Sequence, residues 1–391
     1  MSQVVFGIVG PSENDALTAA TSCYAYALNR LGYDARVIDF RVPELAQSFK
    51  QHIQKGDIAF AFGLQGVGSQ LKAGDNTTCL WTAIKKPFIS LHNDHPCHNI
   101  HNHYGDSSFV ANLYHFDSFR EAKEKYLPSG QISKYMPMGF AVADSSPRIA
   151  FAERPIKFLY MKNSCDLSAE QAYCDALPAP LRDAVRQQTE RALKNPNLEL
   201  CDLVDEVFTS HGFSRHQLWD EFWDIARVMD RSIRHARAAA FIEWLKFQEG
   251  AVIIGDGWDT VDKTGTRAVF KPAMSAYASH MLYQQSQIVC NTNPYGRDII
   301  HERTMAGLGI GACVFSDTNG WWEKNASDIA SLALYNWSDP LDDQLQSHLK
   351  DMKKAGEAAS ASVAAYHRLF PAQDVGQLVR LAEDVRSQNG N

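Results

Sequence analysis

The sequence predicts an α/β protein built from two Rossmann-like domains that face each other across a cleft. Short apolar strands alternate with helical stretches before Pro147, and the same alternation begins again after it. The length of 391 residues suits two domains of ordinary size. Alternating strands and helices form parallel βαβ units, whose ligands bind beyond the carboxyl ends of the strands. We therefore expect the functional residues at strand ends.

The first half carries apolar runs of strand length separated by helical stretches. Residues 16–31 place Ala, Tyr and Leu at helical spacing. Strands are expected at residues 4–9 (VVFGIV), 35–38 (ARVI), 58–62 (IAFAF) and 87–91 (PFISL). These elements define an N-terminal domain over residues 1–145, which we assign to the acceptor side of the cleft.

The second half repeats the pattern around one long amphipathic helix at residues 228–248. Strands are expected at residues 156–161 (IKFLYM), 251–254 (AVII), 288–290 (IVC) and 312–315 (ACVF). The Gly, Pro and Ser content of residues 138–155 marks the boundary. A C-terminal domain then spans residues 146–345, and we expect the helical residues 346–391 to pack back towards the N-terminal domain.

Composition narrows the functional class. Hydrophobic residues make up 45% and charged residues 21% of the chain, as in an ordinary globular protein, and the net charge of -7 argues against nucleic-acid binding. The eight cysteines form no CxxC pair, which argues against a zinc ribbon or a redox dithiol. Without a recognisable signal peptide or membrane span, we expect a cytoplasmic protein; peripheral association with the inner membrane stays open.

Residues 291–317 (NTNPYGRDIIHERTMAGLGIGACVFSD) form the most informative segment. Turn residues from Asn291 through Asn293 lead into a helix, which Asp298 can cap. The N-terminus of such a helix attracts phosphate, and Arg303 adds a charged donor for a diphosphate. Glu302 can accept hydrogen bonds from a ribose. The alternative is an ordinary crossover helix with a solvated His-Glu-Arg face.

This segment resembles the C-terminal signature of CgeB-like bacterial glycosyltransferases, which are related to the group-1 glycosyltransferases and have the GT-B fold. The matching positions are Asn291, Pro294, His301, Glu302, Arg303, Gly311 and Asp317. The resemblance implies that these residues lie around a nucleotide sugar. One position departs from the family: Ala306 stands where many members carry a ribose-binding Glu. Glu302 is the candidate substitute.

The resemblance covers about residues 57–325 and reaches the first half through a similar strand–x–D–x–P element at residues 86–99. Residues 252–258 (VIIGDGW) form a strand followed by a turn, in which Gly255 and Gly257 permit close backbone approach and Trp258 offers an apolar wall. Lys162 follows the strand at residues 156–161 and is a candidate phosphate contact. Residues 229–245 resemble the family's D-x-x-I-R-x-x-R helix; its arginines, Arg234 and Arg237, bind anionic groups of the substrate or pair with surface carboxylates.

The richest polar cluster of the first half follows the strand at residues 87–91. Sugar transfer needs a base that accepts the proton of the acceptor hydroxyl, and Asp94 and His95 at this strand end are the candidates. The alternative is that Asp94 caps the next helix and His95 only packs. Five histidines crowd the region, and we interpret them as a solvated loop rather than a metal site: His92, His95, His98, His101 and His103.

The first strand ends in a Gly-Pro-Ser turn that does not match a dinucleotide fingerprint. Gly10, Ser12 and Asn14 are candidate contacts on the acceptor side, and a simple glycine turn with an N-cap is the alternative.

The resemblance therefore implies a transferase that moves a sugar from a nucleotide sugar to a glycan, lipid-linked or protein acceptor, as in polysaccharide biosynthesis. The alternatives are a nucleotide-sugar epimerase of the same architecture and a non-catalytic nucleotide-sugar-binding protein. We expect no cofactor and no metal, because a helix dipole and basic side chains can stabilise the leaving diphosphate.

Overall fold

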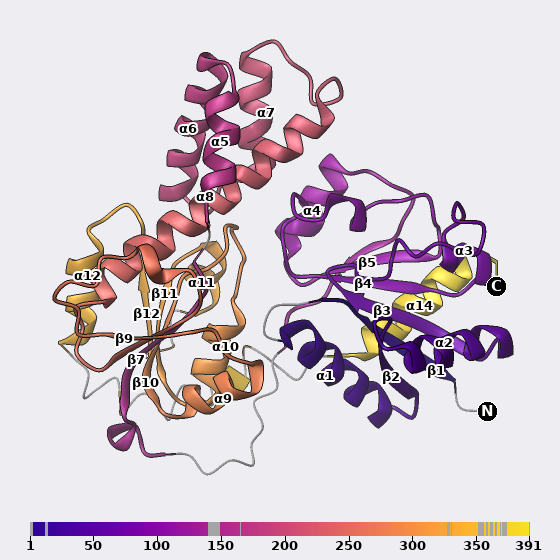
Figure 1. The fold of residues 1–391 in the computed structure, drawn as a ribbon, viewed down its shortest axis with the longest axis horizontal. Helices are drawn as coiled ribbons and strands as arrows, with labels where there is room; N and C mark the ends of the chain where they lie inside the picture. The colour runs from indigo at the N-terminus through magenta and orange to yellow at the C-terminus, as the bar shows by residue number, and fades with distance from the viewer. Residues whose placement is uncertain are drawn as a thin grey trace. The chain divides into compact units, whose positions relative to one another are not determined.

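The computed structural model describes residues 3–11, 15–139, 149–164, 166–326, 329, 331–350 and 374–390, with positions 356, 359, 363, 366, 367 and 369. The chain divides into two compact units, Met1–Met138 with Gln373–Asn391, and Gly139–Ala372. Each unit is a six-stranded sheet with helices around it (Figure 1). The prediction of an α/β fold with two Rossmann-like domains is confirmed.

The first unit holds a parallel sheet of order β2-β1-β3-β4-β5-β6. Its strands are β1 (Val4–Val9), β2 (Asp34–Asp39), β3 (Ile58–Leu64), β4 (Phe88–His92), β5 (Val110–Tyr114) and β6 (Ser133–Tyr135). The strand order reverses between β1 and β3, and ligands of open sheets bind outside the carboxyl ends at such a switch point.

Helix α2 of the first unit begins and ends at residues that commonly start and stop helices. Pro43 occupies the first turn of α2, and Gly56 with a φ of 69° ends it. Arg386 near the chain end donates to the Ala59 carbonyl at 2.7 Å, and the last helix packs on β4 and β5. The helices are α1 (Ala16–Arg30), α2 (Pro43–Lys55), α3 (Leu80–Ile84), the 3-10 helix η2 (Ile100–Asn102), α4 (Asp117–Tyr126) and α14 (Gly376–Gln388).

The second unit holds a parallel sheet of order β12-β11-β10-β7-β8-β9. Its strands are β7 (Ile156–Met161), β8 (Ala251–Ile254), β9 (Val269–Lys271), β10 (Ser286–Asn291), β11 (Cys313–Asp317) and β12 (Leu332–Tyr335). From β7 the chain proceeds to one side through β8 and β9, and then crosses to the other side at β10. The switch point of this sheet therefore lies between β7 and β10.

One long helix dominates the second unit. Helices α5 to α7 pack beside its first half (Figure 1). Phe241 in its second half stacks on Tyr160 and Tyr335 of the sheet, with ring centroids 5.3 and 5.6 Å apart. The helices are η3 (Phe151–Glu153), α5 (Ser168–Ala176), α6 (Ala179–Lys194), α7 (Leu200–Ser210), α8 (Trp219–Leu245), η4 (Trp258–Thr260), α9 (Ala276–Gln284), α10 (Glu302–Gly309), α11 (Gly320–Asn325) and α12 (Leu341–Leu349). Among the described residues, no helix has the length and apolar character needed to cross a membrane.

Candidate functional site

Two cationic side chains meet at Thr292, which follows β10 at the switch point of the second sheet. The Lys162 ammonium donates to Thr292 Oγ1 at 3.0 Å, and Arg303 Nη2 donates to the Thr292 carbonyl oxygen at 3.3 Å. Tyr160 Oη lies 2.8 Å from the same Oγ1. The sequence analysis identified Lys162 and Arg303 as candidates but not Thr292. The position of Thr292 between two asparagines at the end of a predicted strand could have identified it. The arrangement concentrates positive charge where open sheets bind ligands.

Arg303 also has a structural task, because its guanidinium joins three elements. Nε donates to Asn291 Oδ1 at 3.0 Å and Nη1 donates to the Met161 carbonyl at 3.0 Å, in addition to the bond to Thr292. A guanidinium has about five N–H groups, so roughly two are left for an anion. The side chain therefore links β7, β10 and α10 and can still bind phosphate.

Helix α10 begins at Glu302, and its N-cap residue is His301. The expectation that Asp298 caps this helix is wrong, because His301 accepts the first helical N–H groups. Its Nδ1 accepts the backbone N–H of Arg303 at 3.3 Å, and its carbonyl accepts that of Thr304 at 3.0 Å. Burial lowers the pKa of His301 to about 4, and the charges of Arg303 and Lys162 act in the same direction. The imidazole is therefore neutral near pH 7.

Glu302 is the acidic side chain of α10. Its side chain is 54% exposed, and Oε2 lies 2.9 Å from His301 Nδ1. Desolvation acts to raise the pKa of Glu302, but the contact with His301 and the charge of Arg303 outweigh it and lower the pKa to about 2. Ala306, where the similar family carries an acid, is 1% exposed and packs in the interior. Glu302, the first residue of α10, therefore supplies a carboxylate at the N-terminus of this helix.

The turn after β8 packs directly on the turn after β7. Gly255 has a φ of 150°, and a Cβ at this position would lie 2.1 Å from the Lys162 carbonyl oxygen. Gly257 has a φ of 80°, and a Cβ there would meet Ser164 at 3.1 Å. Trp258 donates its indole N–H to the Lys162 carbonyl at 2.7 Å and is 4% exposed. The two glycines therefore permit a close backbone approach that holds Lys162, and Trp258 packs in the core.

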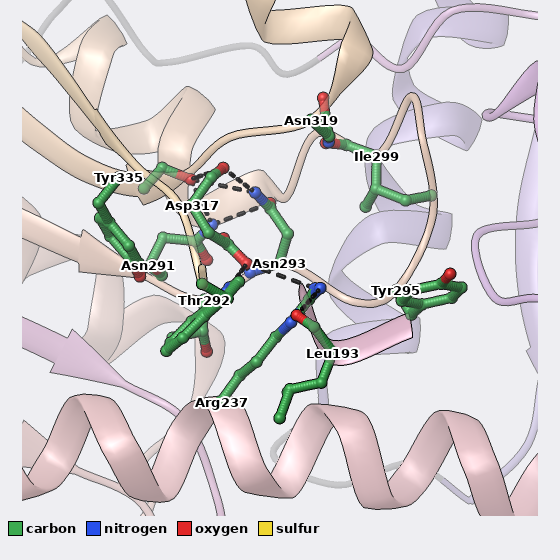
Figure 2. A network of polar contacts seen from close by, with 12 residues as sticks. Leu193, Arg237, Asn291, Thr292, Asn293, Tyr295, Ile299, Asp317, Asn319 and Tyr335 are labelled. Atoms are coloured by element: carbon green, nitrogen blue, oxygen red, sulfur yellow. Dashed lines mark hydrogen bonds and ion pairs between the residues drawn. The ribbon is translucent and has the colours of Figure 1, made fainter. Parts of the chain in front are cut away.

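Asn291 and Asn293 are buried, with exposed fractions of 0% and 2%. Asn291 Nδ2 donates to Asn293 Oδ1 at 2.9 Å, and both amides donate to Ser316 Oγ. The backbone N–H of Asn293 donates to Asp317 Oδ1 at 2.7 Å (Figure 2). These contacts direct both asparagine amides into the protein interior, where they hold β10 against β11.

Behind these amides lies a buried ion pair that sequence reasoning missed. Arg237 of α8 and Asp317 of β11 are each 1% exposed, and Arg237 Nη1 lies 3.6 Å from Asp317 Oδ2. Trp337 donates its indole N–H to the same oxygen at 2.9 Å. A surface pairing, one of the two roles expected for Arg237, is therefore wrong. The sequence offered one indication of this pairing, which is that Arg237 and Asp317 both lie in segments that resemble the same family.

Arg234 pairs with Asp230 on the same helix, at 2.6 Å between Nε and Oδ2. The Asp230 side chain is fully buried and the Arg234 side chain is 19% exposed, so a surface pairing is wrong here too. The reason is that α5 to α7 pack beside α8 and cover much of its surface.

In the first unit, Gln65 orients the candidate base. Gln65 follows β3 with a φ of 54°, and its Nε2 donates to Asp94 Oδ2 at 2.8 Å. His95 Nδ1 accepts the backbone N–H of Cys97 at 3.2 Å, which places the proton of the neutral ring on Nε2. Proton acceptance through Nε2 would need the other tautomer. This geometry favours Asp94 over His95 as the base.

The interpretation of the histidine-rich segment as a solvated loop is wrong for three of its members. His92, His95 and His103 are buried, because their rings pack against aromatic neighbours. His92 stacks on His103 with ring centroids 3.9 Å apart, and its Nε2 lies 2.9 Å from Asn112 Oδ1. Burial lowers the pKa of His92 to about 4 and that of His103 well below the usual value. The cluster therefore belongs to the neutral interior of the first unit.

Gly10 follows β1 at the switch point of the first sheet, and a Cβ there would lie 3.2 Å from Val67 Cγ1. Ser12 and Asn14, the other two residues assigned to the acceptor side, lie outside the described residues.

No family model matches the chain, and a search of curated proteins found no match. Solved structures do match. HepE of Anabaena, crystallised with UDP-glucose, is 10% identical over 99% of both chains with a TM-score of 0.50. Sucrose-phosphate synthase of Thermosynechococcus elongatus is 11% identical over 99% of this chain and 97% of its own, also with a TM-score of 0.50. The likeness shows a shared fold, and the architecture is the GT-B fold seen in glycosyltransferase structures.

Proposed function

We propose that this protein is a glycosyltransferase of the CgeB-like branch, which moves a sugar from a nucleotide sugar to a glycan, lipid-linked or protein acceptor. The observation that carries the proposal is the meeting of Lys162 and Arg303 at Thr292, next to the start of α10. Surface polysaccharide or glycoconjugate assembly is the process in which such a reaction is expected.

The chemistry of sugar transfer suits this arrangement. When the bond between the sugar and the diphosphate breaks, negative charge develops on the departing nucleoside diphosphate. Lys162 and Arg303 carry positive charge, and the N-terminus of α10 adds the positive end of a helix dipole. Preformed charges of this kind stabilise a transition state without reorganisation. We propose on this basis that the reaction needs no metal ion.

A nucleotide sugar as substrate is also supported by the comparisons. HepE has the same fold and was crystallised with UDP-glucose. In this chain the carboxyl edge of the second sheet carries the two cations at its switch point, between β7 and β10. The acceptor must supply a hydroxyl, and we assign Asp94, held by Gln65, as the base that accepts its proton.

The proposal is tested with a panel of UDP, GDP, CMP and dTDP sugars incubated with the purified protein. Slow release of the nucleotide without formation of an epimer is the expected result, since transferases hydrolyse their substrate when no acceptor is present. Formation of an epimer without release would instead identify an epimerase. Binding without turnover, even with acceptors supplied, would identify a non-catalytic protein. Release that stops in EDTA would contradict metal independence.

Affinity for the nucleoside diphosphate tests the site itself. Lys162→Met and Arg303→Met should each weaken binding about 10- to 100-fold, because a hydrogen bond to a charged group contributes about 1.5–3 kcal/mol. Lys157→Met is the matched control, since Lys157 is an exposed lysine of the same strand, towards its amino end. Calorimetric titration gives the dissociation constants. Wild-type affinity in both variants would show that the diphosphate binds elsewhere.

A further inference from the structure

A continuous chain of polar contacts runs from the buried ion pair to Arg303. Figure 2 shows its part from Arg237 and Asp317 to Asn291. Asp317, paired with Arg237, accepts the backbone N–H of Asn293 at 2.7 Å and, through its own carbonyl, the Asn293 amide at 3.0 Å. Asn293 Oδ1 accepts from Asn291 Nδ2 at 2.9 Å. Asn291 Oδ1 accepts from Arg303 Nε at 3.0 Å. The buried acid and the candidate phosphate-binding cation are therefore three hydrogen bonds apart.

Each hydrogen bond of this chain determines how the next side-chain amide is oriented. The Asn293 amide group must direct Nδ2 to the Asp317 carbonyl, so its oxygen faces Asn291. Asn291 then directs Nδ2 to that oxygen, which leaves its own oxygen for Arg303. A reversed amide at either position would place two donors or two acceptors against each other in a dry interior, which costs about 1–3 kcal/mol for each unmade bond. The orientation of both amides is therefore set by the main-chain carbonyl of Asp317, while the Asp317 carboxylate holds the backbone N–H of Asn293.

The charge of Asp317 is compensated inside the protein. Arg237 lies over the rings of Tyr295 and Trp337, with its guanidinium carbon 5.6 and 5.7 Å from the ring centroids. Its Nη2 donates to the Leu193 carbonyl at 3.2 Å. Both charged groups are 1% exposed, so neither is placed to touch a substrate. Any effect of Asp317 on binding must therefore act through the groups that it holds.

The same network holds the loop that leads from β10 into α10. The Tyr295 hydroxyl donates to the Leu198 carbonyl at 2.8 Å, and the Asn319 amide donates to the Ile299 carbonyl at 2.7 Å. Trp321 donates its backbone N–H to the Arg297 carbonyl of the loop at 3.1 Å. The loop is thus fixed at its start by Asp317 and again before the first turn of α10.

We propose that Asp317 is a positioning residue: through Asn293 and Asn291 it holds the Arg303 guanidinium in place to bind the diphosphate of the nucleotide sugar. The inference rests on the proposed function and assigns to a buried side chain part of the affinity of that site. Removing the Asp317 charge leaves the backbone N–H of Asn293 without a charged acceptor and Arg237 without its counter-ion. Asn293 is then held less firmly, although the main-chain carbonyl of residue 317 still accepts its amide.

A double-mutant cycle on binding of UDP, or of whichever nucleoside diphosphate the panel selects, tests the proposal. Asp317→Asn should weaken binding about tenfold when Arg303 is present, and less than about twofold in an Arg303→Met background. Asn291→Ala removes the last link and should show the same dependence on Arg303. This second variant keeps the test decisive if Asp317→Asn does not fold.

Arg154→Gln is the matched control for a loss of stability alone. Arg154 is a buried guanidinium that holds the opposite end of the same sheet, donating to the carbonyls of Ser286 and Ile310 at 2.9 Å each. The Arg154→Gln variant should have a lower Tm than the wild type but the same dissociation constant for the nucleoside diphosphate. Equal weakening by Arg154→Gln and Asp317→Asn, or equal weakening by Asp317→Asn with and without Arg303, would overturn the positioning role. If the wild type binds no nucleoside diphosphate, the proposed function fails instead.

Discussion

Lowering the pH from about 7 to about 5 should destabilise the first unit, because His115 is buried in its neutral form. His115 Nδ1 donates to the Met136 carbonyl at 2.9 Å, and Nε2 lies 2.9 Å from the Tyr24 hydroxyl, which donates to it. Both ring nitrogens are therefore satisfied without a second proton. Burial lowers the pKa of His115 to about 4, opposed only partly by the bond to Met136.

The sign and size follow from proton linkage. The unfolded chain binds a proton on this histidine near its ordinary pKa of 6.5, whereas the folded protein does so only near 4. Between these values the unfolded state holds more protons, so stability rises with pH and is lost as the pH falls through this window. Over the stated change His115 alone should remove about 2 kcal/mol from the free energy of unfolding. His92, with a pKa of about 4, acts in the same direction.

Amide hydrogen exchange measures this effect within the first unit, without requiring the whole chain to unfold in two states. Peptides covering β1, β4 and β5 are compared at both pH values after correction for intrinsic exchange rates. His115→Gln should lower stability at pH 7 and reduce its pH dependence by about 2 kcal/mol. His101→Gln, at an exposed position, is the control. An unchanged pH dependence in His115→Gln would refute the reasoning.

Three further substitutions test the contacts of the second unit. Gly255→Ala should lower the free energy of unfolding by several kcal/mol, because the new Cβ would lie 2.1 Å from a backbone oxygen. Gly265→Ala, with open space around it, is the control and should lower it by only about 1 kcal/mol. Thermal unfolding compares the two variants. Trp258→Phe removes the indole hydrogen bond to the Lys162 carbonyl and should cost about 1–3 kcal/mol by the same measurement. Arg237→Met leaves a buried carboxylate unpaired and should cost about 3–5 kcal/mol, most of which Asp317→Asn should restore in the double variant; a cost that simply adds would contradict the pairing.

The sequence predicts the central strands well. The expected strands at residues 4–9, 156–161 and 251–254 coincide with β1, β7 and β8, because a continuous apolar run is buried on both faces of a parallel sheet. β6 and β9 were not predicted, since they are three residues long and carry exposed side chains at the sheet edges. β5 was missed although it is buried, because a polar residue, Asn112, interrupts its apolar run.

The sequence predicted where the candidate site lies but not which of its side chains face a ligand. Lys162 follows β7, and Arg303 lies in the helix that follows β10. Placing both at one edge of the sheet was possible because parallel strands present their carboxyl ends there. Whether Asn291 and Asn293 face a ligand or the interior could not be read from the same argument. Adjacent positions at a strand end differ in direction by local backbone geometry, and the partners that capture their amides, Ser316 and Asp317, come from another strand.

The sequence by itself determined the two α/β units, the strand edge that carries the candidate site and the resemblance to a transferase family. These properties arise from apolar runs and turn residues that act over a few neighbouring positions. Only the tertiary structure decided that Arg237 lies against Asp317 and that both reach Arg303 through two asparagines. Such a buried pairing joins α8, β10 and β11, and its free energy depends on the exclusion of water by packing, which no local pattern encodes.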